Sequence, residues 1–336
     1  MRIFIVSAFL LFNNILSSQT ISSIPQVKEE TIHSEIIGMD YKLKISLPFF
    51  FDPKNNSYPV FYYLDAWTTS GTMNEMLKSG MFNNSIDKII GVGISFEANP
   101  KTFSQIRGRD YCPPLSSNDS LKAADKFHEF LEKELIPFME EKYNADPKDR
   151  GILGYSLGGL FSTWTMNQEK PLFNRLGILS PSLWYGGEDL ILENEHFLNY
   201  AKNAKGLRVF ISCGALEGKP MIKAAEKLYK ILSKNKNIEV KKVIFEGETH
   251  GSCLPAASHR AINYLYLSKY YILKNEGMKH YFSKEYSKAA NKFEEAIRLY
   301  PNSSNEADYY DLACFYSLSE EFDKAFKLLN KLKNSE

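Results

Sequence analysis

Hydrophobic and polar positions along this chain divide it into short strand-like and longer helix-like segments. Residues 207–213 are mostly apolar, and residues 238–245 begin with alternation and are rich in β-branched side chains, so both predict β-strands. Helices are predicted at 121–143, from about residue 219, and at 256–267. Strands that alternate with helices favour an α/β fold with a mostly parallel sheet.

One predicted strand-to-helix turn carries candidate chemistry. The apolar pair Ile152-Leu153 leads into Gly154-Tyr155-Ser156-Leu157-Gly158, and a helical stretch follows at 160–166. A G-x-S-x-G turn in this context is typical of a nucleophile elbow, which exposes a serine hydroxyl at a helix N-terminus. The pattern predicts that Ser156 is the nucleophile of an acyl transfer through a serine ester.

A serine nucleophile needs a base and an acid that orients the base. His250 follows the predicted strand 238–245, and Glu217 follows the predicted strand 207–213, so both are expected at carboxyl ends of strands. The order Ser156, Glu217, His250 is that of α/β-hydrolases. Four other carboxylates remain candidates for the acid: Glu188, Asp189, Glu246 and Glu248. A structural role is favoured for the other histidines, which are His33, His128, His196, His259 and His280. His33 is expected before the first strand.

From about residue 29 to 268 the chain resembles the putative-esterase family of α/β-hydrolases, which includes siderophore esterases, S-formylglutathione hydrolase, feruloyl and acetylxylan esterases and mycolyltransferases. The resemblance implies an α/β-hydrolase fold, with a mostly parallel sheet flanked by helices, and is strongest to the siderophore-esterase branch. It rests on seven ordered blocks: residues 34–48, 58–65, 107–111, 127–143, the serine turn, Ser180-Pro-Ser-Leu-Trp184 and Thr249-His-Gly-Ser252.

The resemblance also implies further site residues. The backbone N–H groups of Leu157 and Trp67 are expected to form the oxyanion hole. Ala66 replaces the family's usual glycine, and a positive φ there would strain it by about 1 kcal/mol. Around this centre we expect three side chains to line the substrate pocket: Arg109, Tyr111 and Trp184. The alternative is that the arginine lies at the surface and the two aromatic residues lie in the core.

The N-terminal residues predict export. Met1-Arg2, an apolar run at 3–12 and a small-residue zone resemble a signal peptide over residues 1–18, and the run is shorter than the about 20 residues of a spanning helix. We therefore expect a bacterial periplasmic or secreted protein without a membrane span after cleavage. With 41 basic and 40 acidic residues, nucleic acid is not an expected partner. The four cysteines lack metal-like spacing, and the proposed chemistry needs no cofactor.

The predicted hydrolase domain spans residues 19–268, and the periodicity changes after it. Residues 269–336 follow tetratricopeptide spacing through Gly277, Ala289, Phe293 and Pro301, so a small all-α region with two repeats is expected, the alternative being a generic pair of helical hairpins. Two repeats are fewer than the about three that a solenoid needs. We therefore expect this tail to pack on the hydrolase, or to serve in a homodimer or a contact with a partner protein.

These features together predict a serine esterase that acts on a small-molecule ester, of siderophore-esterase type. Three alternatives stay open at this point. One is a feruloyl or acetyl carbohydrate esterase, another is a weakly active exported scaffold that acts through the helical tail, and the third is transfer of the acyl group to an acceptor other than water.

Overall fold

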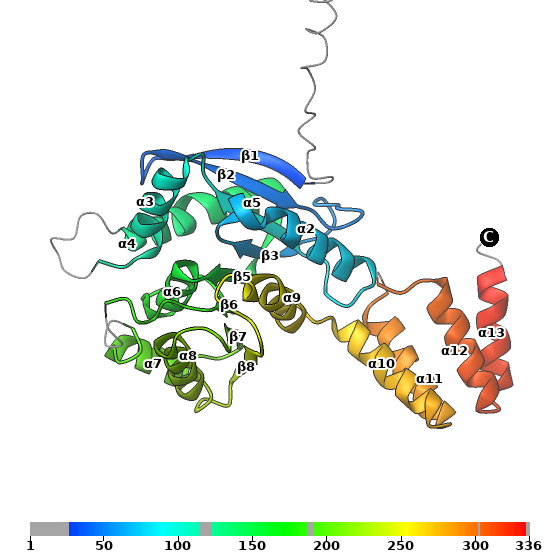
Figure 1. The fold of residues 1–336 in the computed structure, drawn as a ribbon. Helices are drawn as coiled ribbons and strands as arrows, with labels where there is room; N and C mark the ends of the chain where they lie inside the picture. Colours follow the sequence, from blue (N-terminus) through cyan, green and yellow to red (C-terminus); the bar gives the residue numbers. More distant parts are fainter. Residues whose placement is uncertain (1–26, 115–122, 187–190, 302, 334–336) are drawn as a thin grey trace, which may run out of the picture.

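An eight-stranded sheet forms the centre of the molecule (Figure 1). The structure is a computed structural model that describes residues 27–114, 123–186, 191–301 and 303–333. The strand order is β1-β2-β4-β3-β5-β6-β7-β8. The strands are β1 (Val27–Ser34), β2 (Met39–Ser46), β3 (Tyr58–Tyr63), β4 (Ile90–Ser95), β5 (Ala145–Tyr155), β6 (Arg175–Leu179), β7 (Leu207–Gly214) and β8 (Ile238–Phe245).

The sheet is antiparallel at one edge and parallel elsewhere. β1 pairs with β2 and β2 with β4 in antiparallel fashion, whereas every pairing from β4 to β8 is parallel. The central strands are buried on both faces, as their apolar sequences require; in β4 all six residues are buried. The carboxyl ends of the parallel strands therefore share one edge of the sheet, where the candidate residues follow β3, β5, β6, β7 and β8.

Helices cover both faces of the sheet (Figure 1). α2 (Ala66–Phe82) and α9 (Cys253–Leu265) pack on one face over a core that includes Phe61 and Phe210. The other face carries the larger core and is covered directly, or through neighbouring helices, by α3 (Pro100–Tyr111), α4 (Ala124–Phe130), α5 (Ile136–Tyr143), α6 (Leu157–Trp164), α7 (Glu195–Asn203) and α8 (Lys219–Leu232). A π-helical turn, Leu131–Leu135, joins α4 to α5. This is the fold expected from the sequence.

Several element boundaries differ from the sequence-based expectation. α6 begins at Leu157, directly after the serine, and α9 begins at Cys253. His33 lies within β1, where its ring bonds to Asp40, rather than before the first strand. The predicted signal peptide, residues 1–18, lies outside the described residues. In the described part of the chain, no helix combines the length and the apolar character needed to cross a bilayer.

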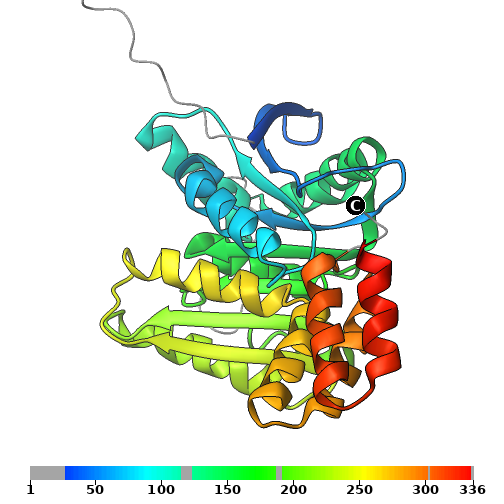
Figure 2. The same ribbon diagram turned by 90° about the vertical axis from the view of Figure 1, so that its right-hand side faces the viewer.

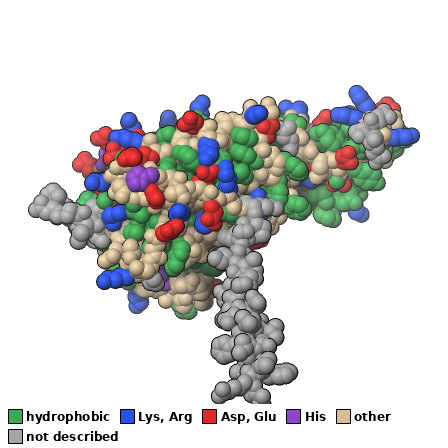
Figure 3. All heavy atoms as spheres, turned by 90° about the horizontal axis from the view of Figure 1, so that it is seen from above, with side chains coloured by type: hydrophobic (Ala, Val, Ile, Leu, Met, Phe, Trp, Pro, Cys, Tyr) green, Lys and Arg blue, Asp and Glu red, His purple; other side chains and the backbone are tan. Residues whose placement is uncertain are grey.

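Four further helices follow the sheet-containing body: α10 (Lys269–Phe282), α11 (Tyr286–Leu299), α12 (Glu306–Leu318) and α13 (Phe322–Lys333). They lie together at one side of the body (Figure 1), the side that faces the viewer in Figure 2, and enclose a core of their own, in which Ala289, Phe293, Phe315 and Ala325 are buried. Hydrophobic side chains also remain at the surface of this arm (Figure 3), where α13 exposes Phe322 and Phe326. That these helices form two tetratricopeptide repeats stays a prediction.

Candidate active site

Ser156 occupies a sharp turn between β5 and α6. Its backbone angles are φ 60° and ψ −117°, a region that costs a non-glycine residue of order 1–3 kcal/mol. The glycines around it permit the close approach that the turn requires. A Cβ at Gly154 would lie 2.0 Å from the carbonyl oxygen of Gly158, and one at Gly159 would lie 2.9 Å from that of Leu179. Steric demands on the two sides of the serine therefore fall on Gly154, the first glycine of the motif, and on Gly159, which directly follows the motif.

The end of β6 holds the strained backbone of Ser156 in place. The Ser156 N–H donates to the Leu179 carbonyl at 3.0 Å, and the Ser182 N–H donates to the Ser156 carbonyl at 3.1 Å. The hydroxyls of Ser156 and Ser182 lie 3.4 Å apart. The Ser180-Pro-Ser182 block therefore fixes the serine turn from the neighbouring strand.

His250 and Glu217 meet across the loops that follow β8 and β7. Nδ1 of His250 lies 2.9 Å from Oε2 of Glu217. The other carboxylate oxygen, Oε1, accepts hydrogen bonds from the Ser180 hydroxyl and the Gly214 N–H, both at 2.6 Å. The Glu217 side chain is 1% exposed and that of His250 is 43% exposed. A buried carboxylate thus orients an imidazole whose other edge is accessible.

Tyr155 flanks the imidazole. Its ring stacks on His250 with centroids 4.8 Å apart and planes 27° from parallel. Burial raises the pKa of the Tyr155 hydroxyl well above its usual range, and the Glu217 carboxylate adds to this effect. The residue between the first glycine and the serine of the motif therefore presents a neutral aromatic face to the histidine.

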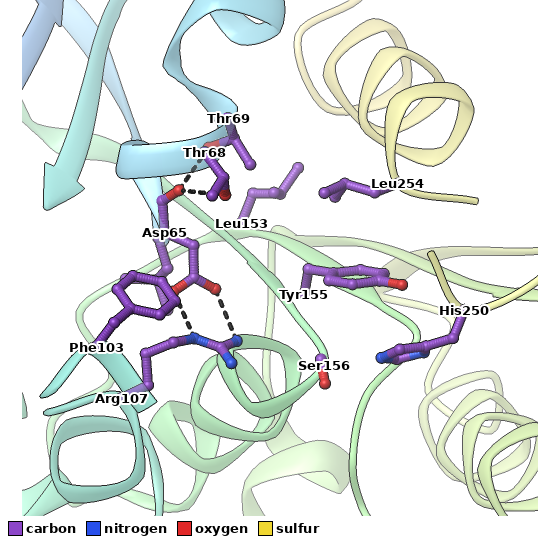
Figure 4. A pocket seen from close by; sticks show the side chains of 11 residues that line it. Asp65, Thr68, Thr69, Phe103, Arg107, Leu153, Tyr155, Ser156, His250 and Leu254 are labelled. Atoms are coloured by element: carbon purple, nitrogen blue, oxygen red, sulfur yellow. Dashed lines mark hydrogen bonds and ion pairs between the residues drawn. The ribbon is translucent and has the colours of Figure 1, made fainter. Parts of the chain in front are cut away.

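Ser156 and His250 face each other across a cavity of about 250 Å³ (Figure 4). The imidazole points toward the serine from the loop between β8 and α9. Contact between the two tightens in many hydrolases only when substrate binds. The cavity is lined by Leu64, Asp65, Thr68, Thr69, Phe103, Arg107, Leu153, Tyr155, Ser156, His250 and Leu254.

Two helices begin at this cavity. α2 starts directly after Asp65, and α6 starts directly after Ser156. The N–H groups of a first helical turn have no acceptor within the helix and favour bound anions. Trp67 and Leu157 both belong to such first turns. The left-handed conformation falls on Asp65, with φ 59°, and not on Ala66, so the alanine carries no positive-φ strain.

An ion pair forms one wall of the cavity. Nε and Nη2 of Arg107 donate to the two carboxylate oxygens of Asp65 at 2.7 and 2.9 Å, and the two side chains are 18% and 10% exposed (Figure 4). Burial raises the pKa of Asp65, while the charge and hydrogen bonds of Arg107 act in the opposite direction. The carboxylate and guanidinium thus compensate each other within the wall.

A family model described as Putative esterase matches residues 34–257, two thirds of the chain. The chain belongs to this family. The esterase is accordingly a carboxylic ester hydrolase, as the sequence predicted.

Three proteins illustrate what the esterase is similar to. It is 28% identical over 262 residues to the ferri-bacillibactin esterase BesA of Bacillus subtilis (strain 168). This match covers 72% of the present chain and 90% of BesA. The crystal structure of the BES protein from Bacillus cereus matches with a TM-score of 0.67 at 25% identity, over 75% of this chain and 98% of that chain. An IroE-like serine hydrolase from Shewanella oneidensis shares the fold, with a TM-score of 0.60 at 19% identity, over 92% of this chain and 99% of that chain. Because residues 1–268 are only about four fifths of this chain, the last match extends into the C-terminal helices.

The three side chains expected in the pocket of the esterase lie outside the cavity wall. Nε of Arg109 donates to Asp110 at 2.6 Å and its Nη2 to the Tyr41 hydroxyl at 3.2 Å, so the guanidinium is held away from the cavity. Tyr111 is 1% exposed and packs in the core against aromatic rings. Trp184 is 54% exposed on the loop after β6. The arginine that reaches the cavity is Arg107, two positions earlier in the chain.

Several residues of the esterase site were not identified from the sequence. Arg107 belongs to a block that carried the family resemblance, but no local pattern distinguishes it from Arg109. Ser180 and Ser182 likewise appear in the sequence only as members of the block Ser180-Pro-Ser-Leu-Trp184. Their contacts with Glu217 and Ser156 depend on how β6 lies beside its neighbouring strands. The tyrosine at position 155 lies between a glycine and the serine of the motif, and this place beside the serine could have indicated its contact with His250.

The cysteines near the esterase site are buried thiols. Cys213 and Cys253 are both free, and burial raises the pKa of Cys253 to about 11. Among the described residues, no group of three or more His, Cys, Asp or Glu side chains is arranged to hold a metal ion.

Proposed function

We propose that the esterase hydrolyses its substrate through Ser156, His250 and Glu217 by way of an acyl-enzyme. The observation that carries the proposal is the 2.9 Å contact between His250 Nδ1 and the buried Glu217 carboxylate, on an imidazole that faces the strained serine. A carboxylate at Nδ1 keeps the proton on that nitrogen, which leaves Nε2 free to accept the serine proton.

The proposed reaction has two stages, acylation and deacylation of Ser156. His250 takes the proton of Ser156 as its oxygen attacks the ester carbonyl, and the N–H groups of Leu157 and Trp67 stabilise the negative oxygen of the tetrahedral intermediate. The C–O bond to the alcohol breaks as His250 returns the proton to the leaving oxygen. Water, deprotonated by the same histidine, releases the acid and regenerates the serine.

We further propose an aromatic ester of siderophore type as the substrate. A relative named for the esterase reaction on ferri-bacillibactin supports this class. Two of the chain's three tryptophans also stand exposed beside the site. Trp67 packs on the cavity residue Phe103, with ring centroids 5.0 Å apart, and Trp184 follows the serine block whose Ser182 bonds Ser156. Exposed aromatic faces suit a substrate larger than the cavity.

Hydrolysis of p-nitrophenyl butyrate by the wild type, Ser156→Ala and Ser182→Ala tests the mechanism. We expect Ser156→Ala to lose about 10³-fold or more in kcat/KM, because the nucleophile is gone. Ser182→Ala removes the facing hydroxyl and should stay within about tenfold of the wild type. Equal activity of Ser156→Ala and wild type would refute the serine mechanism and favour the scaffold alternative.

The same proteins assayed on ferri-bacillibactin and on methyl ferulate test the substrate class. A higher kcat/KM on the siderophore supports the proposal. A higher kcat/KM on methyl ferulate would transfer the function to the feruloyl-esterase alternative.

Two predictions concern the rest of the chain. Export through residues 1–18 is checked by locating the protein in cell fractions of a bacterial host. Dimerisation or partner binding through the C-terminal helices stays a prediction, which light scattering of the purified protein checks for the dimer.

A further inference from the structure

The strongest unassigned feature lies beside the cavity, where α3 contacts the start of α2 at two points. Arg107 bonds both carboxylate oxygens of Asp65, and Phe103 packs on Trp67. Phe103 and Arg107 are four residues apart and so share one face of α3. Asp65 and Trp67 flank Ala66 at the start of α2, which begins beside the cavity residue Asp65. One helix face therefore contacts both of these residues.

Asp65 is held by two separate sets of contacts. Its backbone adopts a left-handed conformation, with φ 59° and ψ 34°, a region that aspartate tolerates better than most residues with a side chain. Its carbonyl accepts hydrogen bonds from the Thr68 N–H at 3.1 Å and from the Thr69 hydroxyl at 3.1 Å. The side chain has a different anchor, the bidentate pair with Arg107. Carbonyl and carboxylate are thus held by separate elements.

Arg107 is itself well fixed. Its guanidinium lies 5.7 Å from the ring centroids of both Phe103 and Tyr111, and its side chain is 18% exposed. Both carboxylate oxygens of Asp65 are engaged by two parallel hydrogen bonds, a geometry that gives orientation as well as energy. Because its charge is already paired with Asp65, Arg107 is poorly suited to be the receptor for an anionic group of the substrate.

We propose that Arg107 is a positioning residue that, through Asp65, aims the oxyanion-hole N–H of Trp67 at the reacting carbonyl. This inference rests on the proposed serine mechanism, and it assigns a role to a side chain that substrate binding does not explain. Oxyanion donors act only when they are aimed correctly before the reaction, since the charge appears only in the transition state. Loss of Arg107 should therefore lower kcat while leaving KM nearly unchanged.

The central experiment compares two esters of matched chain length, neutral p-nitrophenyl hexanoate and the anionic p-nitrophenyl monoester of adipic acid. For Arg107→Met we expect a loss of about 10- to 100-fold in kcat on both esters, less than the loss of a whole oxyanion donor. KM should stay within about threefold. A loss confined to the anionic ester and expressed in KM would overturn the proposal in favour of anion recognition.

Arg175→Met is a matched control. Arg175 makes the same bidentate pair with Asp149 and stacks on Tyr266, but it lies at the start of β6, at the opposite edge of the sheet from the site. It should lower the melting temperature without changing kcat. A kcat loss in Arg175→Met equal to that in Arg107→Met would mean that general destabilisation explains both, and would overturn the proposal.

A transition-state analogue supplies a readout that a purely structural role would not change. An alkyl trifluoromethyl ketone adds to the serine and forms an oxyanion in the same position. Its inhibition constant should therefore rise in Arg107→Met by the same factor by which kcat falls. Arg107→Lys should recover only part of the loss, because an ammonium cannot reproduce the bidentate fork. An unchanged inhibition constant would overturn the proposal.

The outcome is separable from that of the proposed function. If Ser156→Ala keeps wild-type activity, the serine mechanism itself fails. If Ser156→Ala is inactive and Arg107→Met retains full kcat on both esters, only the positioning role fails.

Discussion

Glu217 receives hydrogen bonds on both carboxylate oxygens, and the two oxygens have different partners. Two donors, the Ser180 hydroxyl and the Gly214 N–H, converge on Oε1, whereas Oε2 meets His250. In Glu217→Gln the two donors would hold the amide oxygen at the Oε1 position, because an NH2 group there would face two other donors. The NH2 would then face Nδ1 of the imidazole, which must accept, and Nε2 would carry the proton.

The Glu217→Gln enzyme would therefore hold the tautomer that cannot accept the proton of Ser156. We expect kcat/KM on p-nitrophenyl butyrate to fall by about 10²- to 10⁴-fold, with little change in melting temperature. Glu246→Gln, an exposed carboxylate in the loop before His250, is the matched control and should retain activity. Retained activity in Glu217→Gln would show that another group orients His250.

At the level of single elements, the edge strand β1 is tied to the C-terminal end of α5 by one carboxylate. Glu30 accepts hydrogen bonds from Lys142 and the Tyr143 hydroxyl, each at 2.9 Å, and pairs with Lys28. The hydrogen bonds from Lys142 and Lys28 lower the pKa of Glu30 to about 2. A lowered carboxyl pKa means that the stabilisation is present above about pH 4.5 and disappears as the pH falls toward 2.

Glu30→Gln should therefore destabilise the esterase at pH 7 by less than about 1 kcal/mol, since the partners Lys28 and Lys142 are 50% and 43% exposed and solvent screens their charges. The difference from wild type should shrink as the pH is lowered from 5 toward 3. Thermal unfolding of both proteins across this range measures it. Glu29→Gln on the same strand is the control, although its carboxylate contacts Lys44. A difference that is constant with pH would exclude an ionic origin.

The elements also show which parts of the site the sequence could predict. The serine turn, β7 and β8 were predictable because their signals are local: glycines beside a serine, and apolar runs of strand length followed by a histidine or a glutamate. The Asp65–Arg107 pair was not, because its partners are 42 residues apart and meet only once α3 packs beside α2. The sequence also could not show that Arg107 lines the cavity and Arg109 does not, since a step of two residues along a helix turns a side chain by about 200°.

At the scale of the whole molecule, the esterase consists of a body and an arm with separate cores. The two cores of the body lie on the faces of the sheet, and the third is enclosed by α10–α13. A short backbone pairing joins the body to the segment that leads into the arm. The Ser268 N–H donates to the Ser85 carbonyl and the Asp87 N–H to the Tyr266 carbonyl, both at 3.0 Å. The cavity between Ser156 and His250 lies at the carboxyl edge of the sheet, and none of its lining residues belongs to the arm.

This arrangement predicts that the arm can loosen without loss of catalysis. Gly277 on α10 faces α11 so closely that a Cβ would lie 2.6 Å from the Phe293 ring and 3.3 Å from the Ala289 carbonyl oxygen. Gly277→Ala should therefore push α10 and α11 apart and destabilise the arm by about 1–3 kcal/mol, reduced by the about 1 kcal/mol that alanine gains in a helix. Lys279→Ala, at an exposed position of the same helix, lacks the clash and is the control.

Hydrogen exchange and ester hydrolysis on the same samples separate the two units. In Gly277→Ala we expect faster exchange across α10–α13, unchanged exchange in β5–β8, and kcat/KM within about twofold of wild type. The Ile86–Leu267 bridge lies four residues after the end of α2, so it offers strain in the arm a route to that helix. A fall in kcat that accompanied faster exchange in α2 would therefore mean that the arm supports the oxyanion turn, and would make the four helices part of the catalytic unit.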